Sequence, residues 1–151
     1  MPHRRHVAKL ICAAPFLAQA AKAAATDAVP ASALVQPAEL VELLKASTPP
    51  MPLHVGFKTL YDQAHIPGSP YAGPGNTEAG LANLKAQVGS LPKDRALVIY
   101  CGCCPWVRCP NIAAAFEQLR GLGFHNVKAV RIDNNFGADW VDKGYPATRG
   151  G

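Results

Sequence analysis

Apolar residues recur along the chain at two spacings, one typical of helices and one typical of buried strands. Between residues 36 and 47, Leu40, Val41 and Leu44 fall on one apolar face, and Pro37 stands at a first helical position. The run "ALVIY" is short, aliphatic and β-branched, as expected for a buried strand. On this basis we predict helices over 36–47, 76–88, 111–123 and 137–146, and strands over 52–55, 96–100 and 126–132.

The predicted strands and helices alternate, and no two strands are joined by a hairpin signal. This order predicts the α/β class with a mostly parallel sheet, and the chain shows no internal repeat. In open parallel sheets, ligands bind where a strand ends at the carboxyl edge and the next helix begins. We therefore expect any functional site at that edge.

The first 25 residues follow neither spacing, and we predict that residues 1–25 are a signal peptide. Arg4, Arg5 and Lys9 precede the apolar stretch "LICAAPFLAQAA", and the alanine-rich "KAAATDA" offers cleavage sites near residues 23–25. The order "RRHVAK" resembles a twin-arginine export signal, and an ordinary secretory signal is the alternative. The apolar stretch is too short and too interrupted for a permanent membrane span. The expected location is periplasmic or secreted.

The rest of the chain divides into a linker (26–33), one domain (34–147) and a C-terminal tail (148–151). Four of the 15 basic residues and none of the 10 acidic residues lie in the predicted signal peptide, so the remaining chain carries a formal charge of about +1. Because no basic stripe remains, we expect no nucleic-acid partner. A domain of this length buries a core without needing disulfides to hold it together.

Four cysteines, Cys101, Cys103, Cys104 and Cys109, lie within nine consecutive residues. Cys101 follows directly on the predicted strand 96–100, where loop N–H groups and the N-terminus of the next helix favour a thiolate over a thiol. Cys101 is therefore the first candidate nucleophile.

Several short motifs are spaced along residues 34–147. They are His65-Ile66-Pro67-Gly68, the strand end Tyr100-Cys101, Gly123-Phe124 before a strand, and Trp140 followed four residues later by Gly144-Tyr145-Pro146. Together with the order of predicted elements, they resemble a rhodanese domain.

The resemblance implies an open parallel sheet with helices on both faces, in a single domain. It also implies a sulfurtransferase that takes sulfane sulfur from a thiosulfate-like donor, holds it as a cysteine persulfide and passes it to a thiol or cyanide. Carried over, that cysteine is Cys101. The implied partners are a small sulfur-containing substrate and a thiol acceptor, and no cofactor is expected.

The chain departs from the family pattern around this cysteine. Where an Asp-x-Arg pair is usual, the residues are His54-Val55-Gly56, so a positive anchor is missing unless Lys58 replaces it. The loop is about five residues longer than usual, and a family-like loop could instead start at Cys103, with Arg108 as its closing arginine. Cys103 is the alternative nucleophile. The candidate loop and substrate-binding residues are Gly102, Cys104, Trp106, Arg108 and Cys109.

Other uses of the four thiols stay open. Structural disulfides could join Cys101 to Cys104, or Cys109 to Cys103 or Cys104. A dithiol oxidoreductase would use the C-x-x-C pair that begins at Cys101. A soft metal could also be bound, but adjacent Cys103 and Cys104 seldom face one centre and the spacing of closed zinc sites is absent, so no metal site is predicted. We interpret His54 as a core histidine in preference to a group that tunes a thiolate.

Overall fold

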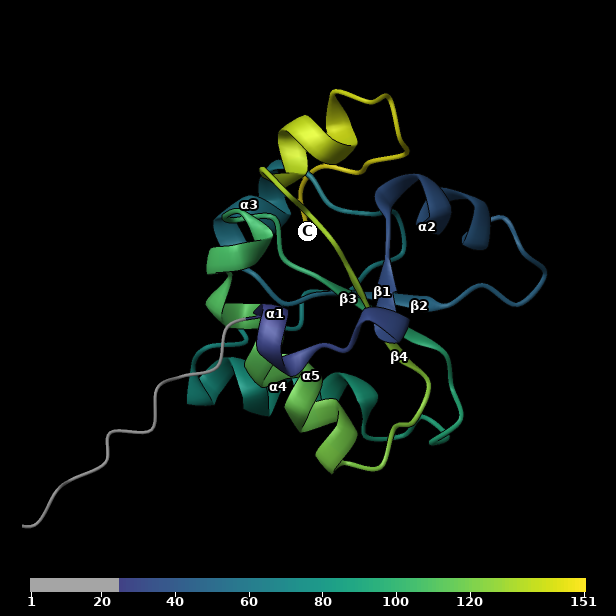
Figure 1. Ribbon diagram of the computed structural model, residues 1–151, viewed down its shortest axis with the longest axis vertical. Helices are drawn as coiled ribbons and strands as arrows, with labels where there is room; N and C mark the ends of the chain where they lie inside the picture. The colour runs from purple at the N-terminus through teal and green to yellow at the C-terminus, as the bar shows by residue number, and fades with distance from the viewer. Residues whose placement is uncertain (1–24) are drawn as a thin grey trace, which may run out of the picture.

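The protein, described here by a computed structural model over residues 25–151, is built on a four-stranded parallel sheet in the order β1–β4–β3–β2 (Figure 1). Its central strand β3 pairs with β2 and with β4, and Leu97 lies opposite Met51 on one side and Val127 on the other. The predicted signal peptide lies outside the described residues, apart from residue 25. The strands are β1 (Leu34–Val35), β2 (Met51–His54), β3 (Leu97–Tyr100) and β4 (Val127–Val130).

Helices cover both faces of the sheet, as the resemblance implies. No helix within residues 25–151 has the length and apolar character needed to cross a bilayer. The helices are α1 (Ala25–Ala28), α2 (Pro37–Leu43), α3 (Lys58–Gln63), α4 (Glu78–Val88) and α5 (Pro110–Gly121), with 3-10 turns η1 (Ala31–Ala33) and η2 (Trp106–Arg108) and a π-helical turn η3 (Gly137–Val141).

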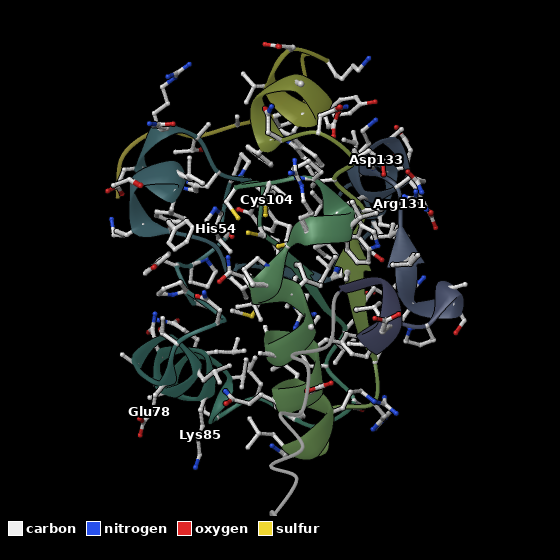
Figure 2. All side chains as sticks on the ribbon, turned by 60° about the vertical axis from the view of Figure 1, so that its left-hand side comes forward. His54, Glu78, Lys85, Cys104, Arg131 and Asp133 are labelled. Carbon is white, nitrogen blue, oxygen red and sulfur yellow. The ribbon has the colours of Figure 1, made fainter. Side chains whose placement is uncertain are left out.

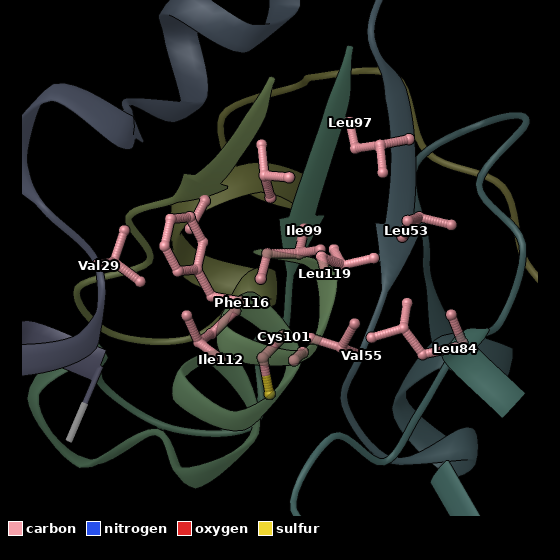
Figure 3. Close-up of a cluster of buried hydrophobic side chains, with 14 of the residues drawn as sticks. Val29, Leu53, Val55, Leu84, Leu97, Ile99, Cys101, Ile112, Phe116 and Leu119 are labelled. Atoms are coloured by element: carbon pink, nitrogen blue, oxygen red, sulfur yellow. The ribbon is translucent and has the colours of Figure 1, made fainter. Parts of the chain in front are cut away.

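The alternating side chains of β3 divide the core into two clusters. Leu97 and Ile99 pack with residues of α4 and α5 on one face, which Figure 3 shows around Phe116 and Leu119. Val98 and Tyr100 point to the opposite face and pack with Leu40 of α2 and Trp140 of η3. Because every residue of β3 is buried, the strand is continuously apolar, as in other parallel sheets covered on both faces.

Most predicted elements are present, with differences at the edges. Strand β1 and helix α3 were not predicted, since two residues and six residues are too short to set a period of their own. Helix α4 is capped by Thr77, whose Oγ1 accepts a hydrogen bond from the Gly80 N–H at 3.0 Å. Helix α5 begins after Cys109 at Pro110, so Asn111 is inside the helix and is not its cap.

Residues 26–33, which the sequence predicts to be a featureless linker, pack against the domain. Val29 is only 4% exposed and joins the same apolar cluster as Phe116, and α1 lies beside α5 (Figure 1). A single apolar residue among small residues forms no periodic pattern, so this contact could not be predicted from the sequence.

The hydroxyl of Tyr100, at the end of β3, fixes the segment His65–Ser69. It accepts a hydrogen bond from the Ile66 N–H at 2.9 Å and donates one to Ser69 Oγ at 2.9 Å. Burial raises the pKa of Tyr100 well above its usual value, so the hydroxyl keeps its proton. The tyrosine therefore ties the motif that begins at His65 to the edge of the sheet where the cysteines lie.

Candidate functional site

Residues 101–109, called the Cys loop from here on, leave β3 at the carboxyl edge of the sheet and lead into α5. The four loop cysteines are free thiols. Cys103 Sγ lies 3.0 Å from Cys101 Sγ and 3.1 Å from Cys104 Sγ. The Sγ atoms of Cys101, Cys103 and Cys109 all lie within 4.8 Å of one another. Sulfur atoms gather beside the Cys104 label in Figure 2, on the side toward His54.

Gly102 gives the loop the turn that brings the sulfurs together. Its φ is +103°, a conformation that residues with a Cβ rarely adopt. A Cβ there would also come within 2.5 Å of the Cβ of Phe136, which donates its backbone N–H to Gly102 O at 3.3 Å. Both the backbone conformation and the space therefore demand glycine at this position.

Asn111, in the first turn of α5, donates hydrogen bonds to the thiols. Its Nδ2 lies 3.3 Å from Cys101 Sγ and 3.6 Å from Cys103 Sγ, while its Oδ1 accepts from the Asn76 N–H at 3.1 Å. The side chain is fully buried. The sequence analysis did not include Asn111 among the candidate site residues, and its place two residues after Cys109 was the only available signal.

Cys101 is the least accessible candidate nucleophile. It is 2% exposed and lies at the edge of the apolar cluster in Figure 3, where its Sγ points away from the aliphatic side chains. The hydrogen bond with Cys103 and the burial of the side chain raise the pKa of Cys101 to about 12, although Cys109 lowers it. The low pKa expected from the strand end is therefore not found, because the neighbouring thiols and burial outweigh the N–H donors.

Cys103 is the better placed thiol. It is partly exposed and lines a cavity of about 240 Å³ together with Gly102 of the same loop. The pKa of Cys103 is raised, with hydrogen bonding to Cys101 lowering it while hydrogen bonding to Cys109 and burial raise it. The other lining residues are His54, Leu60, Gln63, Ala64, Asn135, Phe136, Gly137 and Val141, none of which carries a full charge at neutral pH when His54 is neutral.

The remaining predicted loop residues take different places. Trp106 is buried in the core beneath the loop, and its backbone N–H donates to Ile132 O at 2.8 Å. Burial and Cys103 raise the pKa of Cys104 to about 11, and the charge of Arg108 opposes this. Arg108 itself is exposed, in η2, and does not line the cavity beside Cys103. Cys109 is buried, and its hydrogen bond with Cys101 raises its pKa.

His54 stands at the end of β2, across the cavity from the loop, and is 1% exposed. Its Nδ1 accepts the Gly56 N–H at 3.3 Å, and burial, helped by His65, lowers its pKa to about 4. A Cβ on Gly56 would lie 2.9 Å from His54 Cε1 and 3.0 Å from Cys101 Sγ. His54 is thus a satisfied core histidine, as interpreted from the sequence, and it also lines the cavity beside Cys103.

Lys58 does not take the place of the missing positive anchor. It pairs with Asp62 on the surface of α3, and its ammonium lies 5.9 Å from the centre of the Tyr71 ring. It is not among the residues that line the cavity beside Cys103. The cavity is therefore largely uncharged.

A scan against protein-family models and a search of curated proteins find no match to this chain. Solved structures do match. The rhodanese-like domain of the Alr3790 protein from Anabaena sp. superposes with a TM-score of 0.57 at 21% identity, over 78% of this chain and 79% of that one. The BH2092 protein from Bacillus halodurans gives a TM-score of 0.60 at 20% identity, over 78% and 77%.

A third similar structure is that of EanB, with a TM-score of 0.54 at 18% identity, over 76% of this chain and 27% of that one. A doubly substituted variant of EanB has also been solved in complex with hercynine. At these identities the likeness establishes the fold and leaves the chemistry to the site. The chain is a single small α/β domain with the rhodanese-like fold, carrying four cysteines in the loop that follows its central strand.

Proposed function

We propose that this domain is a sulfurtransferase that carries sulfane sulfur as a persulfide on Cys103, the alternative to Cys101. The observation that carries the proposal is that Cys103 lines the 240 Å³ cavity at the carboxyl edge of the sheet, whereas Cys101 is 2% exposed. Ligands of open parallel sheets bind at that edge. A partly exposed thiol with a cavity in front of it can meet a donor and then an acceptor.

The reaction follows ordinary thiol chemistry. The Cys103 thiolate attacks the outer sulfur of a sulfane donor, a new S–S bond forms on Cys103, and the donor's S–S bond breaks. With thiosulfate, sulfite leaves with the bonding electron pair. A thiolate or cyanide then attacks the terminal sulfur and takes it, and the Cys103 thiolate leaves. Asn111 Nδ2 and the hydrogen bonds with Cys101 and Cys104 support the negative charge on Cys103.

The lining of the cavity favours a particular kind of donor. Gln63 and Asn135 offer uncharged polar groups, and the rest of the lining is mostly apolar. A doubly charged donor such as thiosulfate would be desolvated there without a cation to pair with. We therefore expect an organic persulfide to load Cys103 at lower concentration than thiosulfate does.

Intact-mass spectrometry of the reduced full chain tests the proposal. Exposure to a sulfane donor should add about 32 Da, and Cys103→Ser should abolish the gain while Cys104→Ser retains it. Circular dichroism of each variant verifies that it is folded. If folded Cys101→Ser loses the gain and Cys103→Ser keeps it, the reactive thiol is Cys101. If no variant and no wild-type sample gains sulfur, the sulfurtransferase assignment fails.

A dithiol oxidoreductase is the second candidate, because Cys101 Sγ and Cys103 Sγ are 3.0 Å apart and both are free. In that reaction the dithiol reduces a disulfide substrate, two new thiols leave, and a bond joins Cys101 to Cys103. This outcome gives a loss of about 2 Da after exposure to a small disulfide, in place of a gain of sulfur.

A further inference from the structure

We propose that Cys101, Cys103 and Cys109 form a three-thiolate binding site for a single soft cation of the Cu(I) type. The three Sγ atoms all lie within 4.8 Å of one another. They come from the end of β3, the middle of the Cys loop and the residue that precedes α5, so the fold brings them together from both ends of the loop. The proposal concerns a ligand of the reduced protein and does not depend on sulfur transfer.

The spacing of the three sulfurs fits a trigonal site. Metal–sulfur bonds of about 2.3 Å in a planar three-coordinate arrangement put the sulfurs about 4.0 Å apart. Cys101 Sγ and Cys103 Sγ now lie 3.0 Å apart, so they must separate by roughly an ångström when a cation enters. Cys103 is partly exposed and lies in a loop, which allows that movement without disturbing the strand.

The ligand set selects the class of ion. All three ligand atoms are sulfur, and soft thiolates favour Cu(I) over hard cations. Closed zinc sites take four ligands in a tetrahedron. Cys104 does not belong to the three-sulfur group found among the described residues, and it follows Cys103 directly in the chain. A three-coordinate d10 ion therefore fits the site better than zinc does.

The surroundings offset the negative charge that three thiolates and one monovalent cation leave behind. Asn111 Nδ2 donates toward two of the sulfurs, at 3.3 Å to Cys101 and 3.6 Å to Cys103. Cys109 is the N-cap residue of the twelve-residue helix α5, where the helix dipole favours negative charge. These donors are fixed in place, because Asn111 is held by its second hydrogen bond to the Asn76 N–H.

Burial suits an ion that is easily oxidised in water. Cys101 is 2% exposed and Cys109 is 3% exposed. Cys103 is partly exposed, so an ion would reach the site from solvent through this thiol. An ion bound to all three would lie beneath the loop with little contact to solvent. Sulfur loading of Cys103 and metal binding would then exclude each other, since both use the same thiolate.

The test is an anaerobic titration of the reduced full chain with Cu(I) against a chromogenic Cu(I) chelator. We expect one equivalent to be retained, and X-ray absorption to find three sulfur ligands at about 2.3 Å. Cys101→Ser, Cys103→Ser and Cys109→Ser should each weaken binding about 100-fold or more, a large loss of the kind expected when a ligand shell is broken. Cys104→Ser tests the number of ligands: Cys104 lies outside the three-sulfur group, so its loss should weaken binding far less than the loss of any of the three ligands. Cys12→Ser, in the predicted signal peptide, is the control and should leave the affinity unchanged.

Each of the following results would overturn the proposal: no retained Cu(I) in the wild-type chain, an equal loss in Cys104→Ser, or two or four sulfur ligands in the absorption spectrum. Equal or tighter retention of Zn²⁺ in a parallel titration would also contradict it. The spectrum is measured on the wild-type chain, so the test stands even if a variant does not fold. Mass gain from a sulfane donor, measured with a copper chelator present, reports sulfur transfer separately.

Discussion

The side-chain amide of Asn111 donates a hydrogen bond of 3.3 Å to Cys101 Sγ from the first turn of α5. The same side chain accepts from the Asn76 N–H. It therefore connects the Cys loop to the segment that precedes α4, and its loss would leave a partly buried backbone donor and a buried thiol without this partner.

Replacing Asn111 by alanine should reduce both stability and thiol reactivity. Loss of buried hydrogen bonds costs about 1–3 kcal/mol in the free energy of unfolding, and the thiolate of Cys103 loses a donor. Urea unfolding and the rate of persulfide formation measure the two effects. Asn83→Ala is the matched control, because it removes an amide that bonds to Tyr71 O, and it should leave the reactivity of the thiols unchanged.

Gly102→Ala should destabilise the domain. The added Cβ would come within 2.5 Å of the Phe136 Cβ and would sit on a residue with φ of +103°. Strain of this kind costs about 1–3 kcal/mol, which thermal unfolding would detect as a lower Tm. Gly121→Ala is the control, since a Cβ at the end of α5 meets nothing within 4 Å, and it should be neutral or stabilising. Equal behaviour of the two variants would refute the packing argument.

The fold was largely predictable because the apolar residues of its longer strands and helices recur at regular spacing. The positions of Tyr100 and of the motif at His65 are explained by the hydrogen bonds that join them in the structure. The site was only partly predictable. The sequence placed the four cysteines together in one loop after the strand. It could not show which thiol is buried, because that depends on the direction of each side chain after the turn at Gly102. Asn111 bonds to Cys101 ten positions away, and no periodic pattern reports such a contact.

The stability of the reduced protein should fall as pH rises above about 8.5, the ordinary range of a thiol. The pKa of Cys101 is raised to about 12 in the fold, so the unfolded chain loses its proton first and unfolding becomes more favourable as pH increases. Urea unfolding at pH 7.5, 8.5 and 9.5, with reductant present, measures the slope. Cys101→Ala should make the slope shallower, with the remaining slope due to the raised pKa values of Cys104 and Cys109, and an unchanged slope in that variant would contradict the assignment.

On the acid side, His54 should make stability fall between pH 6.5 and about pH 4. Burial lowers the pKa of His54 from 6.5 to about 4. Between these values the unfolded chain binds a proton at this residue and the folded chain does not, so the free energy of unfolding falls as pH falls. The full effect is on the order of 3 kcal/mol. Denaturant unfolding across this pH range should show a weaker dependence in His54→Asn. Replacement of the exposed His125 by glutamine should keep the wild-type dependence.

Export is a separate prediction, and it is checked on protein taken from the periplasm or the medium. The processed chain should begin between Ala21 and Thr26, which leaves Val29 in place to pack on α5. N-terminal sequencing gives the answer, and an intact Met1 on protein retained in the cytoplasm would refute the signal peptide.

Gly56 stands where the resemblance to rhodanese domains would place the arginine of the usual Asp-x-Arg pair. Because a Cβ there would lie 2.9 Å from His54 Cε1 and 3.0 Å from Cys101 Sγ, no larger residue fits unless both neighbours move. A single substitution of Gly56 by arginine would therefore force His54 or Cys101 to shift. Engineering of anionic donor specificity would therefore start from side chains that do line the cavity beside Cys103, such as Gln63 and Asn135.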